Sequence, residues 1–301
     1  MKNLSLTGGN GFVGKNLISY LRSSKDLSIY NIQRTELNGE ISLVNTNAVI
    51  HLAGKAHDLK KSSDPQEYYT VNFELTKKLY DAFLKSDATK FIFISSVKAA
   101  ADSVKDSLDE NRIPDPITDY GKSKLMAEEY IKSQPLPDGK SYYILRPCMI
   151  HGPGNKGNLN LLYQVVKKGI PYPLAAFENK RSFLSVDNLC FVIRELIIRD
   201  DIPSGIYNVS DGESLSTSQV VTILSNSLHK KPRLWKISPS FIHAVAKIGD
   251  KLHLPLTTER LGKLTESFVV SNNKLMSALN KPLPLSAEEG LALTAKSFKN
   301  T

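Results

Sequence analysis

Short apolar segments alternate with longer amphipathic segments along the first two-thirds of the chain. The short segments are rich in Ile, Leu and Phe, as strands buried on both faces of a parallel sheet are. In one of the longer segments, apolar residues recur at helical steps of four: Val71, Leu75, Leu79 and Phe83. We expect strands at residues 4–6, 28–33, 48–52, 91–94, 142–145 and 206–209, and helices at residues 13–21, 68–84 and 120–131. This alternation predicts an α/β fold with a doubly wound parallel sheet.

The pattern changes after Arg146-Pro147, where residues 151–158 are polar and rich in turn-forming residues. We expect residues 1–150 to form the sheet domain, with 182–210 returning to it. A smaller, mostly C-terminal substrate lobe would comprise residues 151–181 and 211–301. Within that lobe, residues 239–254 predict a surface amphipathic helix. We favour packing on its own lobe over a position on a membrane surface.

Composition narrows the class of protein. The chain has 301 residues, of which 41% are hydrophobic and 23% charged, and this is typical of a globular protein. No apolar run is long enough for a membrane span, and the first residues do not form a secretory signal. Cys148 and Cys190 are too few for a disulfide framework, so we expect a cytoplasmic protein. The net charge of +9 is spread in short pairs, which favours an anionic small substrate over nucleic acid.

A glycine-rich segment, Thr7 to Gly14, follows the first expected strand and opens the first expected helix. In a Rossmann-type fold an early glycine, here Gly8, makes the tight turn. Gly11 lets the backbone approach a pyrophosphate, and Gly14 lets the helix pack on the strand. Phe12 and Val13 then begin the helix, whose N-terminal N–H groups face the phosphates. The segment therefore predicts a site for a dinucleotide, and residues 1–150 become an NAD(P)-binding domain.

The end of the second strand is where an NAD site carries an acidic residue that binds the ribose. Here that position is Gln33, followed by Arg34. An arginine suits the 2′-phosphate of NADP(H) through charge-assisted hydrogen bonds. We therefore favour NADP(H), while Glu36 keeps NAD(H) open.

Tyr120 and Lys124 lie four residues apart in an expected helix and so share one face. An ammonium group near a phenol lowers the phenol's pKa, which makes a tyrosine usable as an acid or base. Ser96 follows the fourth expected strand, where its hydroxyl could bind the same substrate oxygen.

Together these motifs resemble the extended short-chain dehydrogenase/reductases, and in particular the branch of nucleotide-sugar epimerases, dehydratases and ketoreductases. The resemblance also covers His51–Gly54, Val71-Asn72, Leu145–Pro147 and Arg181–Leu189. It implies that Ser96, Tyr120 and Lys124 are catalytic. It further implies cofactor contacts at Leu52, Ala53, Gly54, Tyr120, Lys124 and Pro147, and substrate contacts at Ser96, Asn158 and Arg181.

Within that branch, a dehydratase would carry an Asp-Glu pair just after the catalytic Ser, where this chain has Val97 and Lys98. Elimination of water needs such acid and base groups, so two reactions remain. We favour reduction of a UDP-4-keto-6-deoxy-hexosamine for surface polysaccharide synthesis, because Gln33 and Arg34 point to NADP(H). A UDP-sugar 4-epimerase, acting on UDP-glucose or UDP-N-acetylglucosamine, stays open.

The bound partner expected from the resemblance is a nucleotide-diphosphate sugar, with no nucleic acid. A homodimer is left open. Three histidines, His51, His57 and His151, are too dispersed for a metal triad, so we expect no metal. A non-catalytic NAD(P)-sensing protein is the alternative of another class. The presence of the Ser96, Tyr120 and Lys124 trio favours an enzyme.

Overall fold

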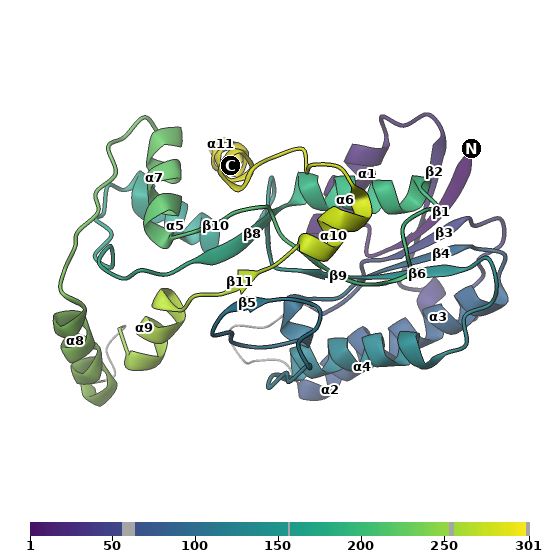
Figure 1. Cartoon of the computed structure of the whole chain (residues 1–301), viewed down its shortest axis with the longest axis horizontal. Helices are drawn as coiled ribbons and strands as arrows, with labels where there is room; N and C mark the ends of the chain where they lie inside the picture. Colours follow the sequence, from purple (N-terminus) through teal and green to yellow (C-terminus); the bar gives the residue numbers. More distant parts are fainter. Residues whose placement is uncertain (56–63, 156, 253–255, 299–301) are drawn as a thin grey trace.

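A six-stranded parallel sheet forms the centre of the larger domain in the computed structural model (Figure 1). The structure describes residues 1–55, 64–155, 157–252 and 256–298, without the side chain of Asn158. The strands lie in the order β2-β1-β3-β4-β6-β9 and have these bounds: β1 Lys2–Thr7, β2 Leu27–Ile32, β3 Ala48–His51, β4 Lys90–Ile94, β6 Ser141–Pro147 and β9 Gly205–Val209. All six lie where the hydrophobic pattern predicts strands. The expected doubly wound α/β sheet is confirmed.

Helices cover both faces of this sheet (Figure 1). On one face, α1 (Phe12–Leu21) packs against α6 (Val186–Ile198), and α10 (Asn273–Leu279) lies against β9. On the other face lie α3 (Leu75–Lys85) and α4 (Asp119–Ser133). Every residue of β3 and β4 is buried, because both faces of these central strands are covered.

The helix expected at residues 68–84 is divided into three parts. A short α2 (Pro65–Tyr68) leads into a π-helical turn, η2 (Tyr69–Glu74), and then into α3. A π-helical turn inside a helix is often found at a functional site. Here it contains Asn72, which is fully buried.

The connection between β2 and β3 contains little regular secondary structure. Between residues 33 and 47, all of them described, only the three-residue 3-10 helix η1 (Glu36–Asn38) is present. β2 is an edge strand of the sheet, and its residues alternate between partly buried and exposed.

The smaller lobe is built around a three-stranded sheet in the order β10-β8-β7, formed by β10 (Ser214–Leu215), β8 (Arg181–Ser185) and β7 (Met149–His151). Three helices share a core with it: α5 (Asn158–Lys167), α7 (Thr217–Ser227) and α11 (Ala287–Ser297). Their contact is made by buried apolar side chains that include Tyr163, Phe183, Leu224 and Leu291. Two more helices, α8 (Pro239–Leu252) and α9 (Thr258–Thr265), lie at the far end of the lobe (Figure 1).

The segment at 182–210 contributes to both parts. β8 pairs with the lobe strands, whereas α6 packs on α1 and β9 joins the central sheet. A two-stranded pairing of β5 (Ser107–Leu108) with β11 (Val269–Val270) also links the two parts of the chain. The domain boundaries given above stay a prediction. None of the helices in the described part of the chain combines the length and apolar content needed to cross a bilayer.

Candidate active site

The glycine segment forms a tight turn between β1 and α1. Gly8 has a φ of +75°, in the region that favours glycine, and Gly11 donates its N–H to the Gly8 carbonyl at 3.0 Å. A Cβ on Gly14 would lie 2.3 Å from the Gly8 oxygen, so only glycine lets α1 approach the turn this closely. No side chain caps α1 at Gly11. The N-terminal N–H groups of α1 are therefore available to an anion such as a pyrophosphate.

The end of β3 lies directly beside this turn. A Cβ on Gly8 would come within 2.6 Å of the Ala53 nitrogen and 2.8 Å of the Leu52 carbonyl carbon. Thr7 holds the two segments together, because its hydroxyl accepts the Ala53 N–H at 3.2 Å. β1 pairs with β2 on one side and with β3 on the other, so the crevice lies at the topological switch point of the sheet. This is where open α/β sheets bind ligands, and the close glycine cradle fits a dinucleotide.

His51 at the end of β3 has a structural role. Its two ring nitrogens lie 2.7 Å from the Thr7 hydroxyl and 2.9 Å from the Thr76 hydroxyl. Burial lowers the pKa of His51 to about 3, with a further contribution from the charge of Lys124. The neutral ring therefore ties β1, β3 and α3 together at neutral pH.

At the end of β2, the nearby carboxylate of Glu36 is already hydrogen-bonded and is not free to bind the cofactor ribose. Asn31 directs its side-chain oxygen toward the Gly9 N–H at 3.3 Å. The Glu36 carboxylate accepts hydrogen bonds from the Tyr30 hydroxyl and, at 2.7 Å, from the Gln33 N–H. Arg34 is exposed beside them. This geometry is compatible with the 2′-phosphate expected at Arg34.

Ser96 and Tyr120 are brought together by close packing between two helices. Ser96 precedes the 3-10 helix η3 (Val97–Ala99) and caps it, accepting the Lys98 N–H at 3.2 Å. Thr118 caps α4 in the same way, through the N–H of Gly121 at 3.2 Å. A Cβ on Gly121 would lie 2.4 Å from the Lys98 carbonyl oxygen. The start of α4 can therefore press against η3 only because Gly121 follows Tyr120.

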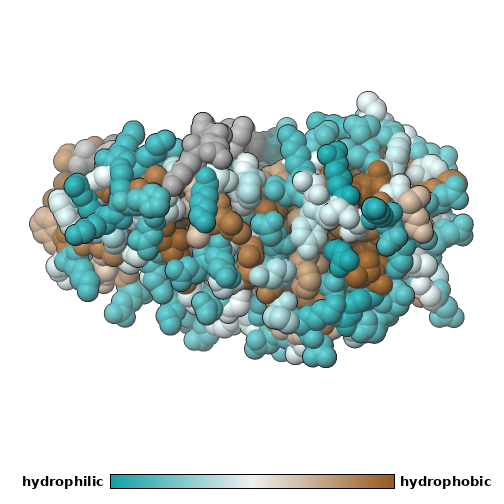
Figure 2. Space-filling view, turned by 90° about the horizontal axis from the view of Figure 1, so that it is seen from above, coloured by the Kyte–Doolittle hydropathy of each residue, from teal (hydrophilic) through white to brown (hydrophobic). Residues whose placement is uncertain are grey.

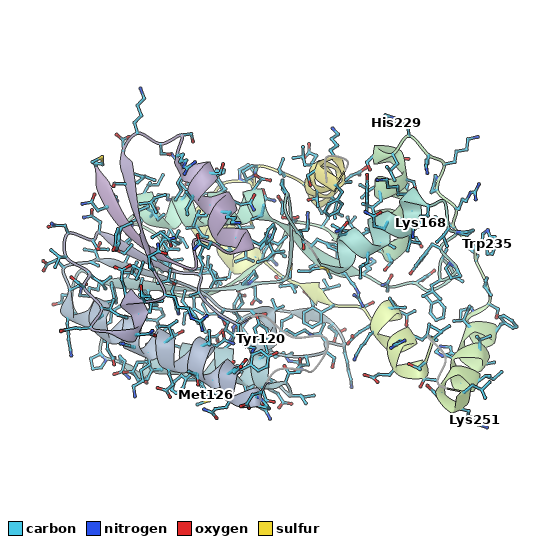
Figure 3. All side chains as sticks on the ribbon, turned by 180° about the vertical axis from the view of Figure 1, so that it is seen from behind. Tyr120, Met126, Lys168, His229, Trp235 and Lys251 are labelled. Atoms are coloured by element: carbon cyan, nitrogen blue, oxygen red, sulfur yellow. The ribbon has the colours of Figure 1, made fainter. Side chains whose placement is uncertain are left out.

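The Ser96 side chain lies close enough to the Tyr120 phenol to influence its pKa. Burial raises the pKa of Tyr120 above its ordinary value of 10, and Ser96 opposes that rise. Figure 3 places Tyr120 at the end of α4 that faces the smaller lobe. The phenol and the serine hydroxyl can therefore address one oxygen atom of a substrate held between the two parts of the chain.

Lys124 lies one helical turn after Tyr120 and is buried. Its ammonium donates to the Ile94 carbonyl at 2.9 Å and lies 4.8 Å from the centre of the Phe93 ring. Burial lowers the pKa of Lys124 to about 8, opposed by the negative charge of Glu128. A Cβ on Gly54 would be 3.0 Å from Nζ, so the ammonium lies against the predicted cofactor loop.

Asn72 also reaches this loop. Its side chain accepts the Lys55 N–H at 2.8 Å and donates to the Lys55 carbonyl at 3.2 Å and to Ser123 Oγ at 3.0 Å. The π-helical turn thus fixes the loop after β3 against helix α4, where Tyr120 and Lys124 lie.

Arg181 and Lys98 form a basic pair on the lobe side. Arg181 donates through Nε to the Glu266 carbonyl at 3.0 Å and through Nη2 to the Lys263 carbonyl at the end of α9. The Lys98 ammonium lies 4.7 Å from the ring centre of Phe268, whose backbone pairs with that of Arg181. Burial lowers the pKa of both basic groups, and the charge of Arg181 contributes to the lowering for Lys98. The Lys98 ammonium also donates to the Asp102 carbonyl at 2.7 Å and lies 3.9 Å from the Asp102 carboxylate. Two cations on this side of the site would suit a doubly charged anion such as a diphosphate.

Comparison with known proteins identifies the family of this chain. Residues 4–210 match the model of the NAD dependent epimerase/dehydratase family. The chain belongs to this family. It is an NAD(P)-dependent enzyme, as the trio and the glycine segment predict.

Relatives in this family include the UDP-glucose 4-epimerase of Vibrio cholerae, which is 30% identical over 99% of this chain and 95% of that protein. The N-acetyl-alpha-D-glucosaminyl-diphospho-ditrans,octacis-undecaprenol 4-epimerase of Escherichia coli O157:H7 is 29% identical over 76% of this chain and 73% of that protein. RMD from Pseudomonas aeruginosa, solved in complex with NADPH, shares the fold. Its structure has a TM-score of 0.77 at 21% identity over all of both chains.

The structure brings most residues of the predicted site to one edge of the sheet. The switch point is surrounded by Gly8, Gly11, Phe12, Val13, Gly14, Leu52, Ala53 and Gly54. Ser96 follows β4, Tyr120 and Lys124 lie in the first half of α4, and Pro147 ends β6. Their individual roles stay predictions. Asn158 begins α5, but its side chain lies outside the described residues, so its predicted substrate contact is not described.

Sequence reasoning gave no role to Asn72, and it used Lys98 only to argue against a dehydratase. The Val71-Asn72 motif was a usable signal for the first. Nothing in the sequence placed Lys98 beside Arg181.

Among the described residues, no three His, Cys, Asp or Glu side chains gather as a metal site. Cys148 and Cys190 are free and buried, and burial raises the pKa of Cys190 to about 12.

Proposed function

We propose that the protein transfers hydride at C4 of a sugar carried on a nucleoside diphosphate, as a UDP-sugar 4-epimerase. The observation that carries this proposal is the packing of the start of α4 against η3, which brings Tyr120 close to Ser96 and leaves the Lys124 ammonium one helical turn away. Oxidation of a sugar alcohol, or reduction of its ketone, needs a group that takes or gives a proton at the reacting oxygen. The phenol of Tyr120 is placed for that role.

Each residue of the trio has a distinct task in this mechanism. Tyr120 takes the proton of the C4 hydroxyl and returns it to the same oxygen. Ser96 donates a hydrogen bond to that oxygen and so fixes its position. The positive charge of Lys124 favours the phenolate form of Tyr120, and its position beside Gly54 suits contact with the nicotinamide ribose.

The NAD(P) site would be formed by the glycine turn, the loop at residues 52–54 and the end of β2. When bound there, NAD(P) supplies the acceptor and donor of the hydride. The protein's own part is to hold the reacting atoms in register and to exclude water. Arg181 and Lys98 would bind the diphosphate of the substrate and thereby place its sugar between Tyr120 and the lobe.

The choice of an epimerase is supported by similarity to the Vibrio cholerae relative along 99% of the chain. The sequence had favoured reduction of a 4-keto sugar, and one observation still favours it. Arg34 is exposed at the end of β2 and the Glu36 carboxylate is engaged by Tyr30 and Gln33, which suits NADP(H) and a reductive direction. We keep the 4-ketoreductase as the second candidate.

One pair of assays separates the two reactions. The purified protein is incubated with UDP-glucose or UDP-N-acetylglucosamine and no added reductant, and the products are separated by chromatography. Formation of the C4 epimer supports the epimerase. In parallel, NADPH and a UDP-4-keto-6-deoxy-hexosamine are mixed with the protein, and nicotinamide absorbance is followed.

Stoichiometric loss of absorbance without epimer formation in the first assay supports the ketoreductase instead. The Tyr120→Phe variant serves as control in both assays, because any true activity must depend on it. If neither reaction exceeds the rate of that variant, the proposed chemistry at C4 of a UDP-sugar is wrong.

A further inference from the structure

The helix α8 carries two apolar stripes, and the lobe covers one of them. Ile242, Ala246 and Gly249 are buried, and they face α9 and the rest of the lobe. The other stripe is formed by Phe241, Ile248 and Leu252, which are 60%, 53% and 64% exposed. The sequence-based preference for a helix packed on its own lobe therefore describes only half of its apolar surface.

The residues of the exposed stripe lie along one side of the helix. Phe241, Ile248 and Leu252 are seven and four residues apart, so they lie on one side of α8 over about 16 Å at a rise of 1.5 Å per residue. Three large apolar side chains in such a row are more than the single exposed residues that are normal on a protein surface. The row needs an apolar partner.

Basic residues flank this stripe on one side. Lys247 and Lys251 are exposed on α8 itself, on the flank of the stripe that lies away from the buried residues. Residues 230–263 contain eight Lys or Arg and only two Asp or Glu, whereas the whole chain has a net charge of +9. The first part of this segment lies beside the end of α5, where Lys230 and Arg233 donate to the Lys167 and Gly169 carbonyls. Lys247 and Lys251 are the basic residues of α8 itself.

An exposed Trp adds to the surface. Trp235, which is 57% exposed, lies at the same end of the molecule as Lys251 (Figure 3). Hydrophobic residues reach the surface at the end of the molecule that carries α7 and α8 (Figure 2). Trp prefers the boundary between apolar and aqueous phases.

We propose that the outward face of α8, formed by Phe241, Ile248 and Leu252 with Lys247 and Lys251, docks the protein on an anionic lipid surface. A helix with bulky apolar residues on one side and lysines beside them lies in the interface plane of a bilayer. The apolar side chains enter the acyl boundary while the ammonium groups remain among anionic headgroups. The proposal does not rest on which sugar reaction the enzyme performs.

A second copy of this chain is a poorer occupant. A symmetric dimer through α8 would bring the same patch of each subunit together. Lys247 and Lys251 of each subunit would then face those of the other, and like charges across an interface oppose association. An anionic surface complements both the charge and the apolar stripe.

The test is co-sedimentation of the purified, full-length protein with lipid vesicles. Vesicles of phosphatidylcholine containing about one-third phosphatidylglycerol are compared with vesicles of phosphatidylcholine alone. We expect the protein to sediment with the anionic vesicles, and the bound fraction to fall as salt is added, because headgroup attraction is screened. Equal binding to both kinds of vesicle, or no binding to either, would overturn the proposal.

Two variants test the named residues. Phe241→Ser/Ile248→Ser/Leu252→Ser removes the stripe, and Lys247→Glu/Lys251→Glu reverses the flanking charge. Each should weaken partition to anionic vesicles by at least tenfold. Both variants must keep the circular dichroism spectrum and NAD(P) binding of the wild type, because all five side chains are exposed and none lies in the proposed active site.

Matched controls change the same residue types elsewhere. Ile113→Ser/Leu161→Ser removes two exposed apolar side chains, which are 85% and 66% exposed, and Lys85→Glu/Lys132→Glu reverses two exposed lysines of α3 and α4. These variants should bind vesicles like the wild type. If the controls lose as much binding as the α8 variants, the surface is not specific to α8. Light scattering that shows a dimer in the wild type and a monomer in the triple variant would assign the face to self-association and overturn the proposal.

Discussion

The Glu128 carboxylate on α4 and the Arg146 guanidinium on β6 form a buried pair, in which Nε lies 3.0 and 3.1 Å from the two carboxylate oxygens. Both side chains are at most 2% exposed. Ser95 at the end of β4 donates its hydroxyl to the same carboxylate. The pair therefore holds α4, which carries Tyr120 and Lys124, against the strand that leads to Ser96.

Loss of one partner of this pair should destabilise the fold more than loss of both. Arg146→Met leaves a buried carboxylate without its countercharge, and such a change costs about 3–5 kcal/mol. Glu128→Met/Arg146→Met removes both charges and should be less destabilising than the single variant. Urea unfolding at pH 7 measures the difference. A double variant less stable than Arg146→Met would contradict this account of the pair.

Tyr120→Phe should lower turnover by at least about 100-fold, because it removes the group that exchanges the proton. NAD(P) affinity should change little. The matched control is Tyr130→Phe on the same helix, whose hydroxyl bonds to Asp81 rather than facing the site. Turnover assays and fluorescence titration with cofactor measure the two effects. Equal losses in both variants would mean that the tyrosine acts only through helix stability.

Gly121→Ala should impair catalysis through geometry alone. A Cβ at this position would lie 2.4 Å from the Lys98 carbonyl oxygen, so α4 must move away from η3. The contact between Tyr120 and Ser96 would lengthen, and turnover should fall at least tenfold. Gly212→Ala is the control, since its Cβ meets nothing within 4 Å. Unchanged turnover in Gly121→Ala would show that the close approach is not needed.

The activity should decline as pH rises through about 8. Burial lowers the pKa of Lys124 to about 8, so the ammonium of the free enzyme is lost above that pH. The profile of kcat/KM reports the free enzyme and should show this alkaline limb. In Lys124→Arg, at a lower overall rate, the limb should move above pH 10, because the guanidinium keeps its charge. The same limb in both proteins would exclude Lys124 as its origin.

The lowered pKa of Lys124 also predicts that its contribution to the free energy of unfolding increases as the pH rises above 8. An unfolded Lys titrates near pH 10.4, whereas Lys124 in the fold titrates near 8. Between these values the unfolded chain binds more protons, so the contribution of this group to stability rises with pH. Below pH 8 both states are protonated and the full cost of burying the charge is present.

Arg34→Ala should raise the Kd for NADPH at least tenfold and leave the Kd for NADH nearly unchanged. The physical reason is the loss of a charge-assisted contact to the 2′-phosphate, which NADH lacks. Arg34 is exposed, so the substitution should not affect folding. Fluorescence titration with both cofactors gives the ratio. If the wild type already prefers NADH, the assignment of Arg34 fails.

The sequence predicts the central sheet well because each strand is a short, uninterrupted apolar segment bounded by turn residues. The π-helical turn at residues 69–74 could not be foreseen, since Val71 and Leu75 keep ordinary helical spacing through it. Spacing and position indicate Ser96, Tyr120 and Lys124, and the family resemblance implies their catalytic role, which stays a prediction. The sequence does not indicate that Lys98 and Arg181 lie on the same side of the site, because 82 residues separate them. Only the tertiary fold brings both into contact with Phe268.

Some residues that carry the family resemblance prove to be structural. Ser185 caps α6 by accepting the Asp187 N–H at 3.2 Å. Asn188 donates to Asp211 at 2.7 Å and to the Leu285 carbonyl at 2.8 Å. These bonds fix the junction between β8 and α6. A motif shared within a family therefore marks fold and chemistry alike, and only geometry separates them.

The sparse connection between β2 and β3 has a consequence for how the cofactor is bound. Edge segments with few buried contacts open most readily, and their amide hydrogens exchange early. β2 alternates between partly buried and exposed residues and is followed by a single 3-10 turn. A dinucleotide that contacts the end of β2 would restrain this edge of the sheet, and part of the binding free energy would be used for that restraint. Amide exchange in β2 should then slow when NAD(P) binds.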